Sequence, residues 1–586
     1  MQNRDSGSFN NYFNQIAILA LAGLIAAVLV LASVPPVDRD ALTHHLAVPK
    51  LYLTHGRIYE IPHVPFSYYP MNLDLLYLVP LSLGSDIAPK YIHYAFALLT
   101  AGLVFSYLRR RFEDRFYALL GGLMFLSLPV IVKLSVTVYV DLGLIFFSTA
   151  SLLQLLRWVE THHQWKHLAL AGLFAGLCLG TKPNGALSFF FLMLAVPFLY
   201  RSKSGAQSPL HLEAQRALLP RGIILKPLGW SVFFAGIAML VYSPWMLRNY
   251  TWTGNPVYPM AISIFGPVTP AHDETRAIGA KEMAETENAE SHSDGSEFGH
   301  FAIRKMVFNE SLWEILAIPI RIFFQGRDDD PRLFDGRLNP YLLILPLIAV
   351  FPLKGRSRSL RLELEIRLIG LFAVLYLVFA FFLVDMRIRY IGPIIPPLTI
   401  LAVVGMHDLI GIVKARCSLR NQLLALSAIG AVFICLLGLN LSYLVGQFGI
   451  VDPMSYLQGK LPRDEYIQKY RPEYAALSFA NANLPEEARI LALFNGNRIY
   501  YSDREMICDN ESFRRAVSAS QSPADLVWRL AQGGISHLLV RLDLFNQWAD
   551  NQFQTSEKQL LKSFFREKLL RLYQGHGYAL FAVTAG

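Results

Sequence analysis

The sequence predicts a polytopic α-helical membrane protein with about eleven transmembrane helices and a small extracytoplasmic α/β domain at its C-terminal end. Three observations indicate this fold class: a mean hydropathy of +0.35, a composition of 53% hydrophobic and only 17% charged residues, and repeated apolar runs long enough to cross a bilayer. A chain of 586 residues with this composition cannot hide its apolar surface in one water-soluble core. Lipid is therefore the expected environment of most of the chain.

The first apolar run, residues 16–34, sets the scale for the others. Its 19 residues, at about 1.5 Å each, match a hydrocarbon core of roughly 30 Å. The run is too long for a signal-peptide core and has neither a basic flank nor a convincing cleavage site, so we expect a retained span. Ten further runs of spanning length follow: 88–108, 116–132, 138–157, 167–181, 184–200, 228–247, 340–353, 368–384, 390–412 and 422–445.

Length and the charge of the loops together indicate whether the segment Met71–Gly84 crosses the membrane. It has 14 residues, including an aspartate and a proline, and is shorter than the ~17 residues that a span normally requires. If it does not span and the N-terminus is cytoplasmic, the inner loops hold 19 Lys and Arg residues against 8 in the outer segments, as the positive-inside rule requires. We therefore expect a juxtamembrane or re-entrant helix here and an extracytoplasmic C-terminus. The inner loops are then 109–115, 157–167, 201–226, 354–367 and 414–420.

Two outer loops belong to the predicted membrane domain, residues 1–450, in the inner (cytoplasmic) membrane. The first outer loop covers 35–88, and a long outer loop covers 248–339. The middle of the long loop, residues 271–301, is polar and aperiodic, so we expect it to be mobile.

The segment 451–586 has the composition of an ordinary soluble domain. The turn signal Asn495-Gly496-Asn497 separates two strand-like runs, and two stretches have helical periodicity. We therefore expect a small exported α/β domain. Its predicted strands are 489–494, 498–502 and 535–541, and its predicted helices are 473–482 and 523–532.

Composition and motifs argue against several classes of function. The net charge of +9 resides mainly in short loops beside predicted spans, so we expect no nucleic-acid partner. The four cysteines show no paired spacing, which argues against a disulfide framework or a zinc site. The sequence contains no GxxxxGK[ST], HExxH or strand-linked GxGxxG motif, so nothing indicates ATP-driven transport, zinc peptidase or dinucleotide chemistry.

Polar residues crowd the first outer loop, where DRDALTHHLAVPKLY follows the first span. Asp38 and Asp40 stand at a membrane–water boundary, where partial desolvation raises a carboxyl pKa towards that of a general base. The alternative, that both aspartates only solvate the end of the span, stays open. The other polar residues of the stretch have a similar alternative as interfacial anchors: His44, His45, Lys50 and Tyr52.

Four cations stand at outer span ends, against the positive-inside bias: Lys182, Arg248, Arg387 and Arg389. A cation kept near hydrocarbon usually has an anionic partner, either a carboxylate such as Asp141 or Asp385 or an anionic headgroup. Convergence with the aspartate cluster favours a phosphate site, because arginine donates two parallel hydrogen bonds to phosphate oxygens. Asp141 is either a second carboxylate of the site or a local helix cap. The run Asp328–Asp330 is expected to be solvated.

The layout resembles the GT-C membrane glycosyltransferases, which include the protein O-mannosyltransferases and the bacterial aminoarabinose transferase acting on lipid A. The resemblance covers roughly residues 10–450 and rests on the motifs DRDALTHHLAVPKLY, YVDLG, TKPNG, PWMLRNY with GNPVYP, and RIRYIGPIIPP. It implies an inverting transferase that moves a sugar from a polyprenyl-phosphate donor to a hydroxyl of a glycan, lipid or protein outside the cytoplasm. The family's catalytic acid maps to Asp40, with Asp38 as second choice, because Arg39 separates an acidic pair that is adjacent in many relatives.

The resemblance also implies roles for the remaining residues. Arg387, Arg389, Lys182 and Arg248 would bind the donor phosphate, and the substrate site would be lined by His44, His45, Lys50, Tyr52, Tyr68, Tyr69, Asp141 and Tyr390. No cofactor is implied, although a divalent cation shared by Asp40 and Asp141 stays open. Two alternatives remain: a transporter or flippase of a lipid-linked saccharide, and a polymerase or ligase of surface polysaccharide. The lack of an internal sequence repeat and the clustering of ionisable residues at one face favour the transferase over a transporter.

Overall fold

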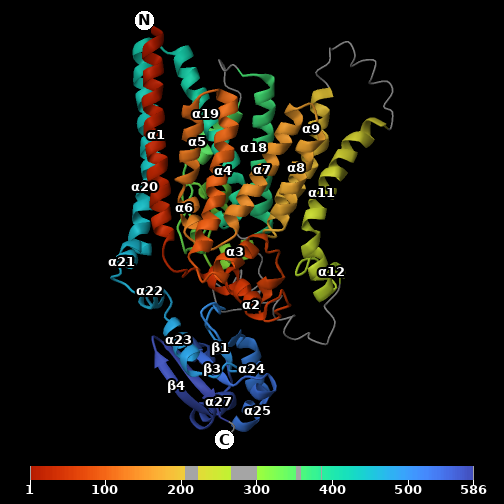
Figure 1. Cartoon of the computed structure of the whole chain (residues 1–586), viewed down its shortest axis with the longest axis vertical. Coiled ribbons are helices and arrows are strands. Elements are labelled where there is room, and N and C mark those ends of the chain that lie inside the picture. Colours follow the sequence, from red (N-terminus) through yellow and green to blue (C-terminus); the bar gives the residue numbers. More distant parts are fainter. Residues whose placement is uncertain (1, 205–221, 266–299, 352–357, 385, 585–586) are drawn as a thin grey trace.

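Long helices form the membrane domain, and a small sheet with its own helices forms the C-terminal domain, as the computed structural model of the chain shows (Figure 1). The structure describes residues 2–204, 222–265, 300–351, 358–384 and 386–584. Nearly all of the stretch 271–301, predicted to be mobile, lies outside the described residues, as do Asp385 and parts of the inner loops 201–226 and 354–367.

Seven helices in the described part of the chain are long and apolar enough to cross a membrane. An eighth candidate is the pair α5 (Arg115–Leu126) and α6 (Pro129–Ser135), which is bent by 66°. Pro129 explains the bend, because it lacks an N–H and keeps Leu128 in an extended conformation with ψ 133°. The seven are α1 (Gln2–Ala32), α4 (Ala88–Phe112), α7 (Asp141–Glu160), α11 (Gly222–Thr253), α18 (Leu360–Leu383), η6 (Ile388–Ile394) continued by α19 (Ile395–Arg416), and α20 (Leu419–Val451).

Three further predicted spans coincide with shorter apolar helices: α8 (Trp165–Leu179), α9 (Gly185–Ser204) and α17 (Tyr341–Val350). Their apolar parts are only 10–17 residues long, so length and composition do not establish that they cross the bilayer. The predicted count of eleven spans is therefore not confirmed. Met71–Gly84 contains α3 (Asn72–Ser82), whose 11 residues are too few to span, in line with the prediction.

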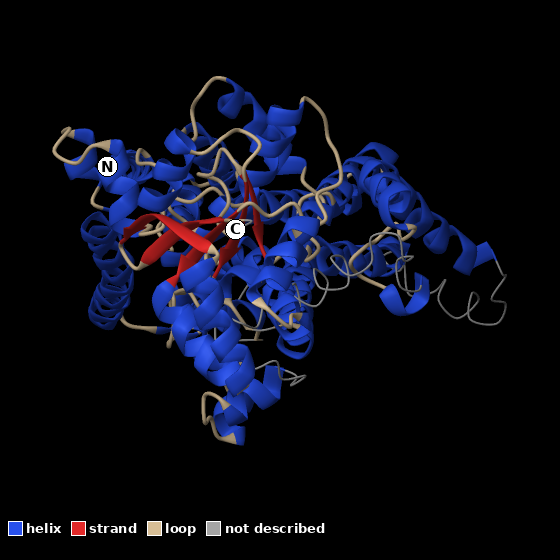
Figure 2. Cartoon of the chain, turned by 90° about the horizontal axis from the view of Figure 1, so that it is seen from below, coloured by secondary structure: helices blue, strands red, loops and turns tan. Residues whose placement is uncertain are grey.

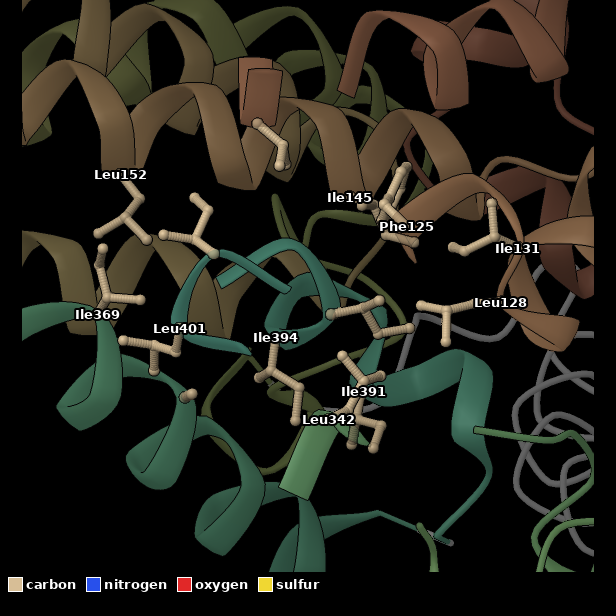
Figure 3. Close-up of a cluster of buried hydrophobic side chains, with 14 of the residues drawn as sticks. Phe125, Leu128, Ile131, Ile145, Leu152, Leu342, Ile369, Ile391, Ile394 and Leu401 are labelled. Atoms are coloured by element: carbon tan, nitrogen blue, oxygen red, sulfur yellow. The ribbon is translucent and has the colours of Figure 1, made fainter. Parts of the chain in front are cut away.

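One large apolar core holds the helix bundle together, and part of it is shown in Figure 3. Ile391 of η6, Leu401 of α19 and Ile145 of α7 are almost completely buried in it. Helices α17 and α19 approach so closely that a Cβ on Gly405 would lie 2.0 Å from the Leu345 carbonyl oxygen, so the contact requires glycine there. The core thereby fixes the position of η6, and with it the position of Arg387, which immediately precedes η6.

Short helices of the outer loops lie below the bundle, and α2 and α3 lie on the side that faces the C-terminal domain (Figure 1). The first outer loop forms the π-helical turn η1 (Ala41–His45), α2 (Ala47–His55), η2 (Pro65–Tyr68) and then α3. The described parts of the long outer loop form α12 (Ile262–Phe265), α14 (His300–Met306), α15 (Leu312–Leu316), α16 (Ile318–Arg321) and η5 (Pro331–Leu333).

The C-terminal domain contains a five-stranded sheet of order β2-β1-β3-β5-β4, visible from below in Figure 2. β1 runs parallel to both β2 and β3, whereas β5 is antiparallel to β3 and β4. The strands are β1 (Arg489–Leu493), β2 (Glu505–Cys508), β3 (His537–Arg541), β4 (Leu569–Gly575) and β5 (Tyr578–Val583). The helices are α21 (Pro453–Leu457), α22 (Arg463–Tyr470), α23 (Tyr474–Asn483), α24 (Asn510–Ala519), α25 (Pro523–Gln532), α26 (Leu542–Gln552) and α27 (Thr555–Glu567).

One predicted strand of this domain is wrong. Residues 498–502 were expected to pair in the sheet, but they form turns and β2 begins only at Glu505. The backbone N–H groups of Ile499 and Tyr500 both donate to the Leu42 carbonyl oxygen, each at 3.1 Å. The apolar pattern of this segment therefore serves docking on the first outer loop. The predicted strands 489–494 and 535–541 and the predicted helices 473–482 and 523–532 are present with small shifts at their ends.

Candidate active site

A cavity of about 930 Å³ lies where the helix bundle, the first outer loop and the C-terminal domain meet. Asp38 and Asp40 from the first loop line it, and so do cations that follow distant helices. The C-terminal domain supplies a third part of the wall. Nine of the sequence-predicted residues line this cavity: Asp38, Asp40, His44, His45, Tyr69, Lys182, Arg387, Arg389 and Tyr390.

Asp40 is paired with Arg389. Arg389 Nη1 donates to Asp40 Oδ2 at 2.5 Å, and the side chains are 15% and 24% exposed. Asp40 immediately precedes η1, and short π-helical turns often occur at functional sites. The Arg389 guanidinium also lies over the rings of Tyr139 and Tyr390, at 5.5 and 5.2 Å from their centres. The pair joins residues 349 positions apart in the chain.

The two aspartates differ in acidity. Burial would raise the pKa of Asp40, but the Arg389 guanidinium holds it well below the ordinary value. Burial raises the pKa of Asp38, and the positive charges of Lys90, Arg471 and Lys133 offset this rise only in part. At neutral pH Asp40 is an ionised carboxylate held by a cation, and Asp38 is the stronger base of the two.

Lys182 makes a second ion pair at the cavity wall. Its Nζ donates to Asp141 Oδ1 at 2.8 Å and lies 5.3 Å from the centre of the Tyr390 ring. Asp141 is the first residue of α7 and is 2% exposed, so it holds Lys182 in place from behind the lining. Asp141 itself does not line the cavity.

His44 and His45 occupy consecutive positions of η1 with different partners. His45 Nδ1 lies 2.6 Å from Asp74 Oδ1, whereas the His44 ring stacks on Phe66 with centres 4.4 Å apart. Burial and the neighbouring His45 lower the pKa of His44 well below its ordinary value. His44 is therefore a neutral group in the wall at neutral pH.

Five predicted site residues lie outside the cavity lining: Arg248, Lys50, Tyr52, Tyr68 and Asp141. Arg248 lies between the rings of Trp245 and Trp252 and donates to the carbonyl oxygens of Tyr68 and Tyr69. Lys50 bonds to the C-terminal domain, and the Tyr52 ring is buried in an apolar cluster. The Tyr68 hydroxyl donates to Glu60 at 2.6 Å.

Several lining residues had no signal in the single sequence. Lys133 lies within 4 Å of three carboxylates, those of Asp328, Asp329 and Asp335. Asp328 is only 16% exposed, so the expectation of a solvated acidic run is correct for Asp329 at 89% but wrong for Asp328. The C-terminal domain adds further polar lining residues: Arg471, Asn495, Asn497, Arg498, Asn510 and Arg541.

Within the described residues, no group of three or more His, Cys, Asp or Glu side chains is arranged to hold a metal ion. Asp40 and Asp141, which were considered as shared ligands, each bind a different cation, Arg389 and Lys182.

A sequence profile of the family described as dolichyl-phosphate-mannose-protein mannosyltransferase matches residues 84–254. This stretch includes α4 to α11 but neither the first-loop aspartates nor Arg387 and Arg389. No curated protein matches the sequence.

Solved structures match nearly the whole chain. ArnT from Cupriavidus metallidurans bound to undecaprenyl phosphate is 13% identical with a TM-score of 0.52, over 96% of this chain and 97% of that chain. Its apo state is 12% identical with a TM-score of 0.53, over 97% and 98%. The Archaeoglobus fulgidus oligosaccharyltransferase, tethered with an acceptor peptide containing the NVT sequon, is 11% identical with a TM-score of 0.50, over 97% and 74%. At these identities the likeness is one of fold, and it confirms the predicted GT-C fold.

Proposed function

We propose that this chain, which has the GT-C fold, is an inverting glycosyltransferase that moves a sugar from a polyprenyl-phosphate donor to an acceptor hydroxyl on the outer face of the cytoplasmic membrane. One observation carries the proposal: the first-loop carboxylate of Asp40 is paired with Arg389 in a cavity that Lys182 and Arg387 also line. The undecaprenyl phosphate bound in the ArnT structure supports a lipid-phosphate donor.

The reaction needs one base and one anion site. Asp40 takes the proton of the acceptor hydroxyl, whose oxygen attacks the anomeric carbon of the sugar. The bond from that carbon to the phosphate oxygen breaks, and the polyprenyl phosphate leaves with the electron pair. Because attack and departure occur on opposite faces of the sugar ring, the configuration inverts without a covalent intermediate. Arg389, Arg387 and Lys182 stabilise the charge that grows on the leaving phosphate.

Arg389 couples donor binding to the strength of the base. Its charge keeps the pKa of Asp40 low, which makes Asp40 a weak proton acceptor while the two side chains are paired. A donor phosphate competes for the same guanidinium, because arginine binds phosphate oxygens through two parallel N–H groups. As Arg389 turns towards the phosphate, the basicity of Asp40 rises when the donor is in place.

The arrangement of charges supports an outward-facing site. The described parts of the basic loops predicted to be internal lie at one end of the bundle (Figure 1), where Arg111 binds Glu365 and Glu160, and Arg361 also binds Glu160. The N-terminus lies at the same end as these loops, and the C-terminal domain lies at the opposite end (Figure 1). By the positive-inside rule the end with the basic loops is cytoplasmic.

The test is transfer by purified full-length protein supplied with a labelled polyprenyl-phosphate sugar and candidate acceptors. Asp40→Asn should lower kcat by about 10²- to 10⁴-fold, the usual contribution of a positioned base, whereas Asp38→Asn should retain most activity. The reverse order would assign the base to Asp38. Movement of the lipid-linked sugar across vesicles without any transfer would contradict the proposal and support a flippase.

A further inference from the structure

Three neighbouring strands of the C-terminal domain end at the Asp40 cavity. Asn495 follows β1, Asn510 follows β2, and Arg541 is the last residue of β3; all three line the cavity. The strands are parallel, and the chain passes from β2 on one side of β1 to β3 on the other. In open sheets with such an order, ligands bind outside the carboxyl ends of the strands, where the order reverses. The soluble domain therefore presents its binding edge to the proposed reaction centre.

This edge carries positive charge that is held in place. Among the described lining residues, the C-terminal domain contributes Arg471, Arg498 and Arg541 and no carboxylate. Arg498 Nε is anchored on the buried Glu473, and Arg471 Nε is anchored on the Val37 carbonyl oxygen at 2.5 Å. Arg541 pairs with the 59% exposed Asp543 at 3.0 Å, a contact that solvent weakens. The wall is thus suited to an anion.

Asn495 provides a second, independent indication of a ligand. It is 1% exposed and its Nδ2 donates to the Arg498 carbonyl oxygen at 2.8 Å. Its buried Oδ1 has no hydrogen-bond partner within the described residues. A buried acceptor left without a donor is energetically unfavourable. A hydroxyl group of a bound molecule would remove this penalty.

We propose that this edge is an acceptor subsite that selects a saccharide bearing a phosphate or carboxylate group. The anionic group binds Arg541 with Arg498, a sugar hydroxyl donates to Asn495 Oδ1, and the neighbouring hydroxyl faces Asp40 across the shared cavity. The assignment of this molecule as acceptor rests on the proposed transferase function, while its binding does not require turnover.

Binding to the full-length Asp40→Asn protein in nanodiscs tests the subsite without turnover. The probes are methyl α-glucoside, its 6-phosphate and methyl α-glucuronide. At least one charged probe should bind about tenfold more tightly than the neutral glucoside, and the comparison of the two separates phosphate from carboxylate recognition. Arg541→Gln should remove this preference and Arg541→Lys should restore part of it. Asp543→Asn, which releases Arg541 from its carboxylate, should increase the affinity for the charged probe two- to threefold.

Arg514→Gln is the matched control, because Arg514 is also 39% exposed and paired with a carboxylate, that of Glu511, but does not line the cavity. It should leave all three affinities unchanged. Equal binding of the three probes, or equal effects of Arg541→Gln and Arg514→Gln, would overturn the subsite. If the charged probe binds through Arg541 but the wild-type protein consumes no lipid-phosphate donor, the subsite stands and the transferase proposal fails. If donor consumption depends on Asp40 but the probes show no charge preference, the transferase proposal stands and the subsite fails.

Discussion

Arg389 makes the contacts that link the candidate base to the candidate phosphate site. Its Nη1 bonds to Asp40, while the rings of Tyr139 and Tyr390 fix the plane of the guanidinium. Its buried Nε has no hydrogen-bond partner within the described residues. An unsatisfied donor of this kind is costly, and a phosphate oxygen would satisfy it. The geometry therefore offers the donor phosphate an N–H of Arg389 from which it can compete with Asp40 for the guanidinium.

The pH dependence of transfer tests this link. Asp40 must be ionised to act as base, and it becomes protonated as the pH falls through its pKa, which Arg389 depresses. Wild-type kcat/KM should therefore show no acid limb from Asp40 between about pH 5 and 8. Arg389→Gln removes the main positive charge that opposes the effect of burial on the Asp40 pKa. The acid limb of the pH profile should therefore move up into this range, and overall activity should fall. Arg387→Gln is the control: it should lower activity and move the limb much less, because Arg387 is not among the main groups that shift the pKa of Asp40.

At the residue level, the sequence predicts how deep a side chain lies in the membrane better than it predicts which way that side chain points. Lys182, Arg248 and Arg389 were all expected at the outer ends of helices, and two of them line the cavity. Arg248 instead lies between two tryptophan rings on α11, because the rotation of a helix about its axis depends on neighbours that the sequence does not specify. Asn495 and Arg541 were missed for a related reason: no pattern tells which edge of a small sheet faces another domain.

At the element level, the segment after β1 is a docking segment. Lys50 of α2 donates to the carbonyl oxygens of Tyr500 and Ser502, both at 2.9 Å, and to Asp503 at 2.8 Å. The Tyr501 hydroxyl donates to the Pro36 carbonyl oxygen at 2.8 Å. The bonds from Lys50 to Tyr500 and Ser502 satisfy backbone carbonyl groups that a strand would have paired. A strand-like apolar pattern alone cannot distinguish pairing in a sheet from packing against a loop.

Removing the Lys50 ammonium should loosen this docking. Lys50→Met keeps most of the apolar stem but loses three hydrogen bonds, and charged hydrogen bonds contribute about 1.5–3 kcal/mol each. Amide exchange at Ile499 and Tyr500 should become at least tenfold faster, as measured by hydrogen exchange with mass spectrometry. Asp503→Asn should have a much smaller effect, because it removes only an ion pair with a 57% exposed carboxylate. Unchanged exchange in Lys50→Met would show that the docking does not depend on Lys50.

The loop at Gly496 should tolerate no side chain. Gly496 has a φ of +63°, and a Cβ there would lie 2.5 Å from Arg498 Nη1, while Arg498 is anchored on Glu473. Gly459 has a similar φ of +71° but open space around it, so Gly459→Ala isolates the backbone cost of about 1–2 kcal/mol. Gly496→Ala should lower the thermal unfolding temperature further and weaken binding of the charged probe. Equal unfolding temperatures for the two variants would mean that Arg498 moves aside freely.

At the level of the whole molecule, the cavity exists only because three parts of the chain meet. The first loop supplies Asp40, the helix bundle supplies Lys182 and Arg389, and the C-terminal domain supplies Asn495 and Arg541. Hydropathy and charge predict the membrane domain and the separate soluble domain, because both signals are averages over many residues. The contact between the two domains depends on a few specific bonds, such as those of Lys50, and averages cannot predict it.

Orientation in the membrane is the whole-molecule property on which the proposed chemistry depends, since polyprenyl-linked donors and an exported acceptor require an outward-facing cavity. In a background without native cysteines, Gln521→Cys and Ser418→Cys place single thiols at exposed positions, one in the C-terminal domain and one in the basic loop 414–420. A membrane-impermeant maleimide applied to intact spheroplasts should label Gln521→Cys fully and Ser418→Cys only after lysis. Labelling of Ser418→Cys before lysis, with Gln521→Cys protected, would place the cavity in the cytoplasm and exclude the proposed outer-face reaction.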